Sequence, residues 1–307
     1  WVVVVNPRAG AGRAARRLEE LRAAARDILR AEVRTTDGPG HATVLARELL
    51  AQGFDGVAAV GGDGTANEVV NGMMDGDRPR NPDAVFATIH AGTGGDLVKT
   101  LAVPSDPAEA MRALARGQVR PIDLLHLRFT GHDGAPQTRI GVNVTGFGLS
   151  GEVVQRANRS SKRLGPATFA VATAAALRTF DPPPVTIEAQ TEGGVAWSWS
   201  GRLSSAFVAN GAYCGGGMWV GRGGAMDDGW ADLTVVPDLP LSRMVLGAPR
   251  LFTGTIDRVK GVSRTRISTL RAISSGATRV SIDVDGEQPG FLPIEIRVLE
   301  KVLRIAQ

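Results

Sequence analysis

The first part of the chain alternates short apolar runs with longer segments of helical periodicity. Residues 2–5, 31–34, 57–60 and 85–89 have the pattern of strands, and residues 13–30, 41–52 and 66–74 have apolar side chains at helical spacing. This alternation predicts a parallel sheet with helices on both faces. Glycine-containing turns follow three of the four strands, at the carboxyl edge where such sheets bind ligands.

After about residue 122 the pattern changes to short alternating strands, such as residues 206–209, 233–236 and 278–283. The expected fold is an α/β N-terminal domain (parallel sheet, helices on both faces) plus a β-rich antiparallel sandwich C-terminal domain with a helical insert. The insert is expected at 165–180, and a second helix is expected at 241–252. We expect domains over 1–122 and 123–297, while the last strands, 294–299 and 302–305, fit either domain, so 298–307 are a candidate return to the first.

The composition of the 307 residues is that of an ordinary soluble protein of two domains. Most of the basic charge behind the net charge of +4 is arginine, which fits codon bias, attraction to phosphate, or an anionic membrane surface. The single cysteine, Cys214, excludes internal disulfides, and the four histidines lack metal-ligand spacing. The most apolar helix-like run, 166–177, is too short to cross a bilayer, which takes roughly 20 residues. We therefore expect a cytoplasmic protein without a transmembrane segment.

The most informative motif is the turn Gly61-Gly62-Asp63-Gly64-Thr65, which separates a strand from a helix. Its glycines allow a ligand to approach the backbone closely, and Thr65 and Glu68 have the spacing of a capping box. A helix N-terminus also favours phosphate. The carboxylate of Asp63 would repel phosphate unless a metal ion or a proton transfer requires it. The motif therefore favours phosphoryl transfer over passive anion binding.

Four further motifs follow a characteristic order: Asn6-Pro7 with Gly10, Gly92-Thr93-x-x-Asp96, Asp227-Asp228-Gly229 and Asp285-Gly286-Glu287. With the central turn and its helix, they make the chain similar to the diacylglycerol/sphingosine-type lipid kinase family, specifically its soluble bacterial branch. The resemblance covers nearly the whole chain. It implies an ATP-dependent kinase that transfers the γ-phosphoryl group to a hydroxyl of a lipid such as diacylglycerol, ceramide or a sphingoid base.

The resemblance also implies the roles of individual residues. Glu287 is the expected proton acceptor, and Asp63 is a rival base or a magnesium-linked acid. Asp228 resembles a structural Mg²⁺ ligand, with the backbone carbonyls of Ala225 and Trp230 completing an oxygen shell. The residues expected to contact ATP are Asn6, Pro7, Arg8, Ala9, Gly10, Thr36, Gly61, Gly62, Asp63, Gly64, Thr65, Ala66, Asn67, Glu68 and Thr93.

One departure from the family pattern is Gly95, which stands where an asparagine is usual, and this puts the specificity in doubt. Two competing functions stay open: an NAD kinase-like enzyme acting on a soluble substrate, and a non-catalytic nucleotide- or lipid-binding relative. Gly10-x-Gly12-x-x-Ala15 also matches a dinucleotide fingerprint. That interpretation is disfavoured because Asn6-Pro7-Arg8-Ala9 intervene after the strand and no acid ends the second strand.

The expected partners are ATP and a lipid at the membrane surface, with peripheral membrane association, without nucleic acid, and with a homo-oligomer left open. Residues 165–180 fit a core helix or a shield for an acyl chain. Asp123 is expected to brace the domain junction by pairing with an arginine, and Trp219 and Trp230 fit a core or a lipid cleft. The basic side chains before the insert fit a solvated face or a contact with anionic lipid: Arg156, Arg159, Lys162 and Arg163.

Overall fold

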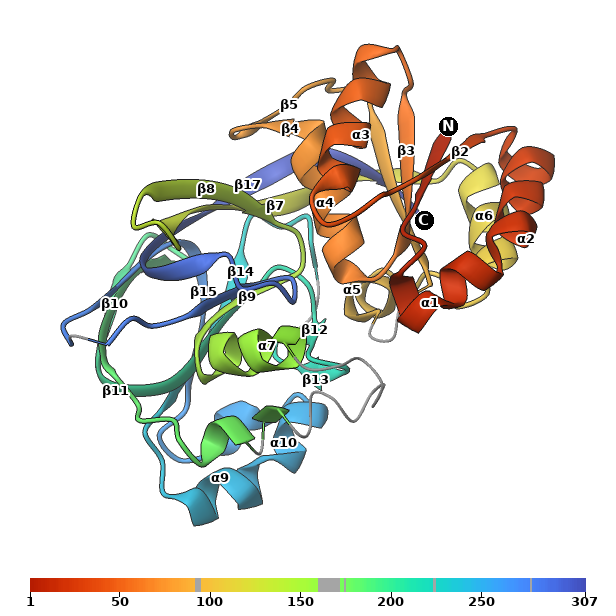
Figure 1. The fold of residues 1–307 in the computed structure, drawn as a ribbon. Coiled ribbons are helices and arrows are strands. Elements are labelled where there is room, and N and C mark those ends of the chain that lie inside the picture. The colour runs from red at the N-terminus through yellow and green to blue at the C-terminus, as the bar shows by residue number, and fades with distance from the viewer. Residues whose placement is uncertain (92–94, 160–171, 174, 223–224, 277) are drawn as a thin grey trace.

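The computed structural model describes residues 1–91, 95–159, 172–173, 175–222, 225–276 and 278–307. The N-terminal part is a parallel sheet with the order β6-β3-β1-β2 (Figure 1). Its strands are β1 (Val2–Val5), β2 (Glu32–Thr35), β3 (Gly56–Gly61) and β6 (Val85–His90). The predicted α/β architecture is confirmed.

Alternate side chains of β1 explain why helices cover both faces of this sheet. Val2 and Val4 belong to the core beneath α3 and α4, whereas Val3 and Val5 belong to the core beneath the opposite helices. The helices are α1 (Ala9–Arg16), α2 (Leu18–Ala24), α3 (His41–Ala51), α4 (Asp63–Met73), α5 (Asp96–Thr100) and α6 (Pro107–Ala115), with a π-helical turn η1 (Ala25–Leu29). A small hairpin, β4 (Met74–Asp75) and β5 (Arg78–Pro79), follows α4.

The prediction of one continuous helix over 13–30 is wrong. The chain leaves helical geometry at Arg17, between α1 and α2, and finishes in the π-helical turn. Leu21 and Ala25 still reach the core, so the apolar spacing was informative about burial although it did not reveal the break. The first residues of α1 are also unusual, because Gly10, Ala11 and Gly12 have φ values of 60°, 56° and 84°.

The C-terminal part is an antiparallel β domain, and all its strands except β12 and β13, which pair only with each other, join the first sheet within a 13-stranded arrangement of the described residues. Its strands are β7 (Val119–Gly131), β8 (Pro136–Gly141), β9 (Val144–Gly148), β10 (Pro184–Thr191), β11 (Ala196–Ala209), β12 (Tyr213–Cys214), β13 (Met218–Trp219), β14 (Ala231–Pro237), β15 (Ser263–Ser274), β16 (Ile282–Val284) and β17 (Gly290–Ala306). The strand predicted over 278–283 is therefore shorter and displaced toward the C-terminus.

A long antiparallel ribbon of β7 and β17 connects the two parts. Near its end, β17 also pairs in parallel with β6 through Arg304 and Ile305. The two runs predicted at the C-terminus are one strand, irregular between Leu299 and Leu303, with Lys301 at a φ of 49°. The end of the chain thus returns to the first sheet.

The helices of the β domain lie on one side of it (Figure 1). Helix α7 (Leu149–Arg159) was not predicted; its Leu149, Val153 and Ala157 pack together with Ala172 and Ala176. Within the expected insert, residues 165–171 and 174 lie outside the described residues, and the rest of 172–177 is helical. The helix expected over 241–252 is two pieces, α9 (Leu241–Gly247) and α10 (Pro249–Phe252), separated at Ala248, which is followed by a proline that has no N–H to donate. A 3₁₀ turn, η3 (Ile256–Arg258), follows.

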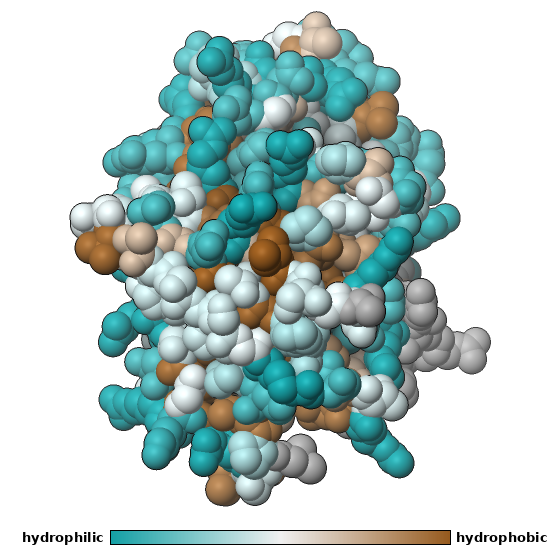
Figure 2. Space-filling view, turned by 90° about the vertical axis from the view of Figure 1, so that its left-hand side faces the viewer, coloured by the Kyte–Doolittle hydropathy of each residue, from teal (hydrophilic) through white to brown (hydrophobic). Residues whose placement is uncertain are grey.

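The surface seen from the side of β10 and β11 is mainly hydrophilic, with small separated apolar areas (Figure 2). No helix among the described residues is long and apolar enough to cross a membrane.

Candidate active site

The glycine turn between β3 and α4 lies at the carboxyl edge of the parallel sheet. Gly62 precedes α4 in an extended conformation, and the helix starts at Asp63. The predicted capping box is wrong, because the Thr65 hydroxyl accepts a hydrogen bond from Asn6 Nδ2 at 3.0 Å. This bond fixes the glycine turn to the turn that follows β1.

Glu68, the other half of the predicted box, also acts between elements. Its carboxylate accepts hydrogen bonds from the amides of Gly40 at 2.8 Å and Ala42 at 3.1 Å, at the start of α3. A carboxylate at a helix N-terminus is favourably placed in the field of the helix. Glu68 thereby holds α3 against α4.

The remaining residues expected to bind ATP surround the same edge of the sheet. Residues 6–10 form the turn after β1, and a Cβ on Gly10 would come 2.5 Å from the Ala91 carbonyl oxygen, so this position requires glycine. Thr36 is buried just after β2, and its amide donates to the Val5 carbonyl at 2.9 Å. Ala66 is buried within α4. Thr93 lies outside the described residues.

Asp63 faces the N-terminus of α5. Its carboxylate accepts hydrogen bonds from the amides of Asp96 at 3.1 Å and Leu97 at 3.3 Å. Burial, with the charge of Asp96 adding to it, raises the pKa of Asp63 from its ordinary value of 3.8 to about 7. The acid in the glycine turn therefore has a structural role in joining two loops, and it titrates near neutral pH.

The turn that carries Glu287 reaches this loop from the second domain. Glu287 Oε1 lies 3.3 Å from the position a Cβ on Gly64 would occupy, so the carboxylate lies against the glycine turn. Its other oxygen, Oε2, pairs with Arg139 Nη2 at 2.6 Å. The structure therefore brings Glu287 against the turn that contains Asp63 and Gly64, more than 200 positions away in the sequence.

Arg139 and Asn67 form the bridge beside this contact. Arg139, from β8, donates through Nε at 2.9 Å and Nη2 at 2.6 Å to Asn67 Oδ1, as well as to Glu287. Asn67 is fully buried in α4. Because one guanidinium binds both groups, the orientation of Glu287 depends on the first domain.

Sequence reasoning missed the role of Arg139, since nothing in its strand distinguishes it from an exposed arginine. A signal was available for Asn67 and Asn71, which are polar and four residues apart on a mostly buried helix. Asn71 Nδ2 donates to the Ile140 carbonyl at 2.9 Å, and its Oδ1 accepts from the Ile140 amide at 2.9 Å. Both asparagines thus serve the contact between α4 and β8.

Asp285 anchors the turn of Glu287 from inside. Its buried carboxylate accepts hydrogen bonds from Asn67 Nδ2 at 2.7 Å and from the amides of Val142, Asn143 and Val144 at 2.8–3.0 Å. Burial raises the pKa of Asp285, and these four N–H groups oppose the shift. In this turn Asp285 has a φ of 50° and Gly286 a φ of 86°. Glycine adopts such a positive φ without strain because it has no Cβ.

Asp96 makes a second connection between the domains. Its Oδ2 accepts from the amide of Gly216 at 2.7 Å, in the turn between β12 and β13, and its Oδ1 pairs with Lys99 at 3.1 Å. The Thr100 hydroxyl accepts from the Ala212 amide at 3.0 Å. The loops of both domains around Asp63 are therefore held together by hydrogen bonds.

The predicted metal loop, residues 225–230, lies at the domain junction. Buried hydrogen bonds link it to the turn that contains Asp285 and Glu287. Asp123 accepts from the amides of Gly229 and Lys301, each at 2.7 Å. Asn210 Nδ2 then donates to the carbonyls of Asp123 at 2.8 Å and Val142 at 2.7 Å, next to Asp285. Asp123 does brace the junction, but through backbone amides, and the expectation of an arginine partner is wrong.

Ala225, Asp228 and Trp230 line one cavity of about 240 Å³, together with Asn210 and Asp232. The buried Asn210 Oδ1 has no hydrogen-bond partner among the described residues. Arg222 and Arg266 line it too, and Arg266 pairs with Asp228. The described residues contain no cluster of three acidic, histidine or cysteine side chains suited to a metal. A Mg²⁺ ion here would take oxygen ligands, and it would compete with Arg266 for the carboxylate of Asp228. Trp230 lies 5.9 Å from the Arg266 guanidinium, in a cation–π contact.

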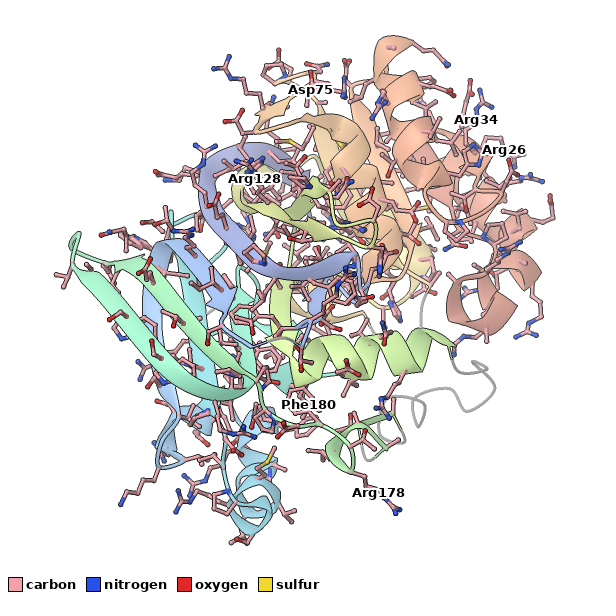
Figure 3. The ribbon with its side chains drawn as sticks, turned by 60° about the vertical axis from the view of Figure 1, so that its left-hand side comes forward. Arg26, Arg34, Asp75, Arg128, Arg178 and Phe180 are labelled. Carbon is pink, nitrogen blue, oxygen red and sulfur yellow. The ribbon has the colours of Figure 1, made fainter. Side chains whose placement is uncertain are left out.

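A second cavity, of about 720 Å³, lies on the outer face of the sheet. Four residues on neighbouring strands face one another in a row of alternating charge. Arg128, labelled in Figure 3, lies opposite Glu295, which lies opposite Arg271, and Arg271 lies opposite Glu188. Opposite charges directly across strands support one another. None of the expected site residues lines this cavity, and its features are those of a solvated sheet face.

Asp283, which the sequence did not single out, can be used to test the electrostatic environment of Asp285 and Glu287. Burial, together with the charges of Asp285 and Glu287, raises the pKa of Asp283 from 3.8 to about 8. A raised pKa means that the folded state holds the proton more tightly, so stability is lost as pH rises from about 4 through 8. Asp283→Asn keeps an oxygen that can accept from the Gly286 amide. We expect it to stabilise the protein by several kcal/mol at pH 8 and by nothing at pH 4, in urea unfolding at both pH values.

Asp133 provides the control for this measurement, because its carboxylate also accepts a turn amide, from Ala135 at 3.0 Å, but it is exposed. Asp133→Asn should change stability equally at both pH values. Parallel stability curves for wild type and Asp283→Asn would contradict the assigned environment.

The fold and this site define a two-domain kinase. A parallel sheet carries the glycine turns, and a β domain supplies an acid against one of them. Residues 1–127 match the diacylglycerol kinase catalytic domain family, and residues 143–307 match the YegS C-terminal NAD kinase beta sandwich-like domain family. The chain therefore belongs to the lipid kinase family that combines these two domains.

Individual relatives agree with this assignment. The chain is 29% identical over 272 residues to "Probable lipid kinase YegS-like" of Xanthomonas euvesicatoria pv. vesicatoria strain 85-10, covering 86% of this chain and 83% of that protein. It is 29% identical over 175 residues to "Sphingoid long-chain bases kinase 1" of Arabidopsis thaliana, covering 56% of this chain and 22% of that protein.

Solved structures show the same fold. A structure of a diacylglycerol kinase from Bacillus anthracis strain Sterne superposes with a TM-score of 0.68 at 22% identity, covering 99% of this chain and 95% of that chain. A second structure from the same strain has a TM-score of 0.73 at 24% identity, covering 99% and 96%.

Proposed function

We propose that this kinase transfers the γ-phosphoryl group of ATP to a hydroxyl group of a lipid such as diacylglycerol, ceramide or a sphingoid base. The observation that supports it most is the position of Glu287, whose Oε1 lies against Gly64 of the glycine turn while Arg139 holds Oε2. A carboxylate held between a phosphate-binding turn and a second domain is well placed to act as the general base that takes the proton of an incoming alcohol. The names of the relatives support both diacylglycerol and sphingoid bases as acceptors.

In this proposal the backbone amides of residues 6–10 and of the glycine turn bind the phosphates of ATP. Glu287 Oε1 accepts the proton of the lipid hydroxyl as the hydroxyl oxygen bonds to the γ-phosphorus. The bond between that phosphorus and its bridging oxygen breaks, and ADP leaves. Mg²⁺ bound with ATP would neutralise charge on the transferring group. Asp63 is the residue of the turn that would hold this ion, or take the proton as the rival base.

The proposal is tested by incubating the protein with γ-labelled ATP, magnesium and a total lipid extract. The expected result is label in a lipid product that dissolves in the organic phase. Label transferred to NAD in the absence of lipid would instead favour a soluble-substrate kinase. Binding of ATP and lipid with no labelled product would favour the non-catalytic alternative.

Magnesium is expected to raise the Tm of the nucleotide-free protein through the loop of residues 225–230. A ligand that binds the folded state alone stabilises it by mass action. Asp228→Asn should reduce the rise, and Arg266→Gln should enlarge it, because the carboxylate then loses its competing cation. Thermal unfolding in magnesium and in a chelator measures the effect, with Asp257→Asn as control. An equal rise in wild type and Asp228→Asn would contradict a metal at this loop.

A further inference from the structure

We propose that the tip formed by α9 and α10 docks the protein onto an anionic lipid bilayer. The inference deepens the proposed function and rests on it, in that the acceptor would be a lipid within that bilayer.

Apolar side chains are unusually exposed on these two helices. Val245 is 62% exposed, Leu246 79% and Phe252 60%. Leu246 has the highest exposed fraction of the large hydrophobic residues in the described chain, and all three lie within eight residues of sequence. Single exposed apolar residues are normal on a soluble protein, but a cluster indicates an interaction surface.

The tip is held in place by the other faces of the same helices. Met244, like Leu177 and Phe180, packs against the cluster that contains Ala172 and Ala176, and with Leu251 it packs against the cluster around Ile256. A Cβ on Gly247 would come 3.0 Å from Val259 Cγ2, so the backbone of α9 lies close to the chain after η3. Anchoring of Met244 and Leu251 orients Val245, Leu246 and Phe252 outward.

The charged side chains of the two helices themselves are all basic. Arg243, Arg250, Arg258 and Lys260 are exposed, and none of them has an ion-pair partner among the described residues. The sequence from 239 to 256 contains no Asp or Glu. Asp257, which follows it, lies 3.8 Å from Arg264 in an ion pair. An apolar cluster surrounded by unpaired cations complements the boundary between the headgroups and acyl chains of an anionic bilayer.

The place of the tip in the molecule fits a docking surface. Helices α9 and α10 lie at the end of the second domain that is remote from the parallel sheet (Figure 1). Arg178 and Phe180 lie at this same end (Figure 3). Contact with a bilayer there would leave the nucleotide-binding edge of the first domain open to solution.

Co-sedimentation with lipid vesicles tests the inference without any catalysis. Wild type should bind vesicles of equal parts phosphatidylglycerol and phosphatidylcholine, and bind pure phosphatidylcholine far more weakly. The double variant Leu246→Ser, Phe252→Ser should lower the affinity for the anionic vesicles about tenfold or more. Val195→Ser is the matched control, because Val195 is 63% exposed on the β10–β11 hairpin.

A second set of variants tests whether vesicle binding requires the basic side chains of the tip. Arg243→Gln with Arg250→Gln should lower the affinity for anionic vesicles about tenfold and weaken its salt dependence. Arg78→Gln, an exposed arginine on β5, should leave it unchanged. All the substituted side chains are exposed, and an unchanged Tm shows that the variants fold.

Binding of the double variant to anionic vesicles with wild-type affinity would overturn the inference. So would a tip mutation that dissociates an oligomer in solution while vesicle binding is unaffected, since a second copy would then be the occupant. Activity separates this inference from the proposed function. The double variant should lose activity on diacylglycerol in vesicles but keep it on a short-chain, water-soluble diacylglycerol. Vesicle binding that depends on the tip, without lipid phosphorylation by wild type, would refute the function and leave the docking surface standing.

Discussion

Replacing Glu287 with glutamine is expected to lower kcat about 10²–10⁴-fold, the contribution typical of a general base. Glutamine keeps the size of the side chain and an oxygen that can accept from Arg139, so the turn should stay in place. It cannot take up the proton of an alcohol. Steady-state kinetics with lipid acceptor and ATP measure the change, and the affinity for ATP should be nearly unaltered.

The matched control for this variant is Glu295→Gln, which alters an exposed carboxylate on β17. Its kcat should equal that of wild type. If Glu287→Gln changed KM for the lipid and left kcat intact, Glu287 would be a binding residue and not the base.

Asp63→Asn is expected to abolish measurable transfer while the protein remains folded. The amide can still accept one hydrogen bond from the start of α5, where Asp63 now accepts from Asp96 and Leu97. It has no charge to hold a metal ion and takes up no proton, so either role of Asp63 is lost. Because the pKa of Asp63 is raised to about 7, wild-type activity should increase as pH rises through this value and the carboxylate ionises.

Asp106→Asn is a control with the same chemistry, because Asp106 caps α6 by accepting from the amides of Ala108 and Glu109, both at 3.0 Å. It should cost a little stability and no activity. Labelled-phosphate transfer over a range of pH, with circular dichroism to verify folding, distinguishes these outcomes. Normal turnover by Asp63→Asn would refute the proposed mechanism.

The sequence predicted the part of the site that one stretch of chain forms by itself. The apolar run of β3, the glycines after it and the start of α4 are local features, set by backbone freedom and side-chain periodicity. The capping box failed although its spacing was correct. The Thr65 hydroxyl instead accepts a hydrogen bond from Asn6, and Glu68 accepts one from the start of α3. The spacing of residues within the turn does not specify these distant partners.

The pairing of Arg139 with Glu287 could not be predicted for the same reason. The two residues are 148 positions apart, and Asn67 and Asp285 are 218 apart. Their contacts depend on how β8 packs on α4 and on where the turn after β16 falls. The break at Arg17 was missed because periodicity shows which side is buried and does not fix where hydrogen bonding stops. Helix α7 was missed although its Leu149, Val153 and Ala157 have helical spacing.

By itself, then, the sequence determined the parallel sheet and its glycine turns, because hydrophobic period and glycine conformation act over a few residues. The candidate acids outside the glycine turn were indicated only by the resemblance to the family. The tertiary structure decided which acids meet. The β7–β17 ribbon brings the second domain against the first, and the buried bonds of Asn67 and Asp285 fix the turn so that Glu287 lies over Gly64. Such contacts arise from the packing of segments distant in sequence, where each contact depends on all the others.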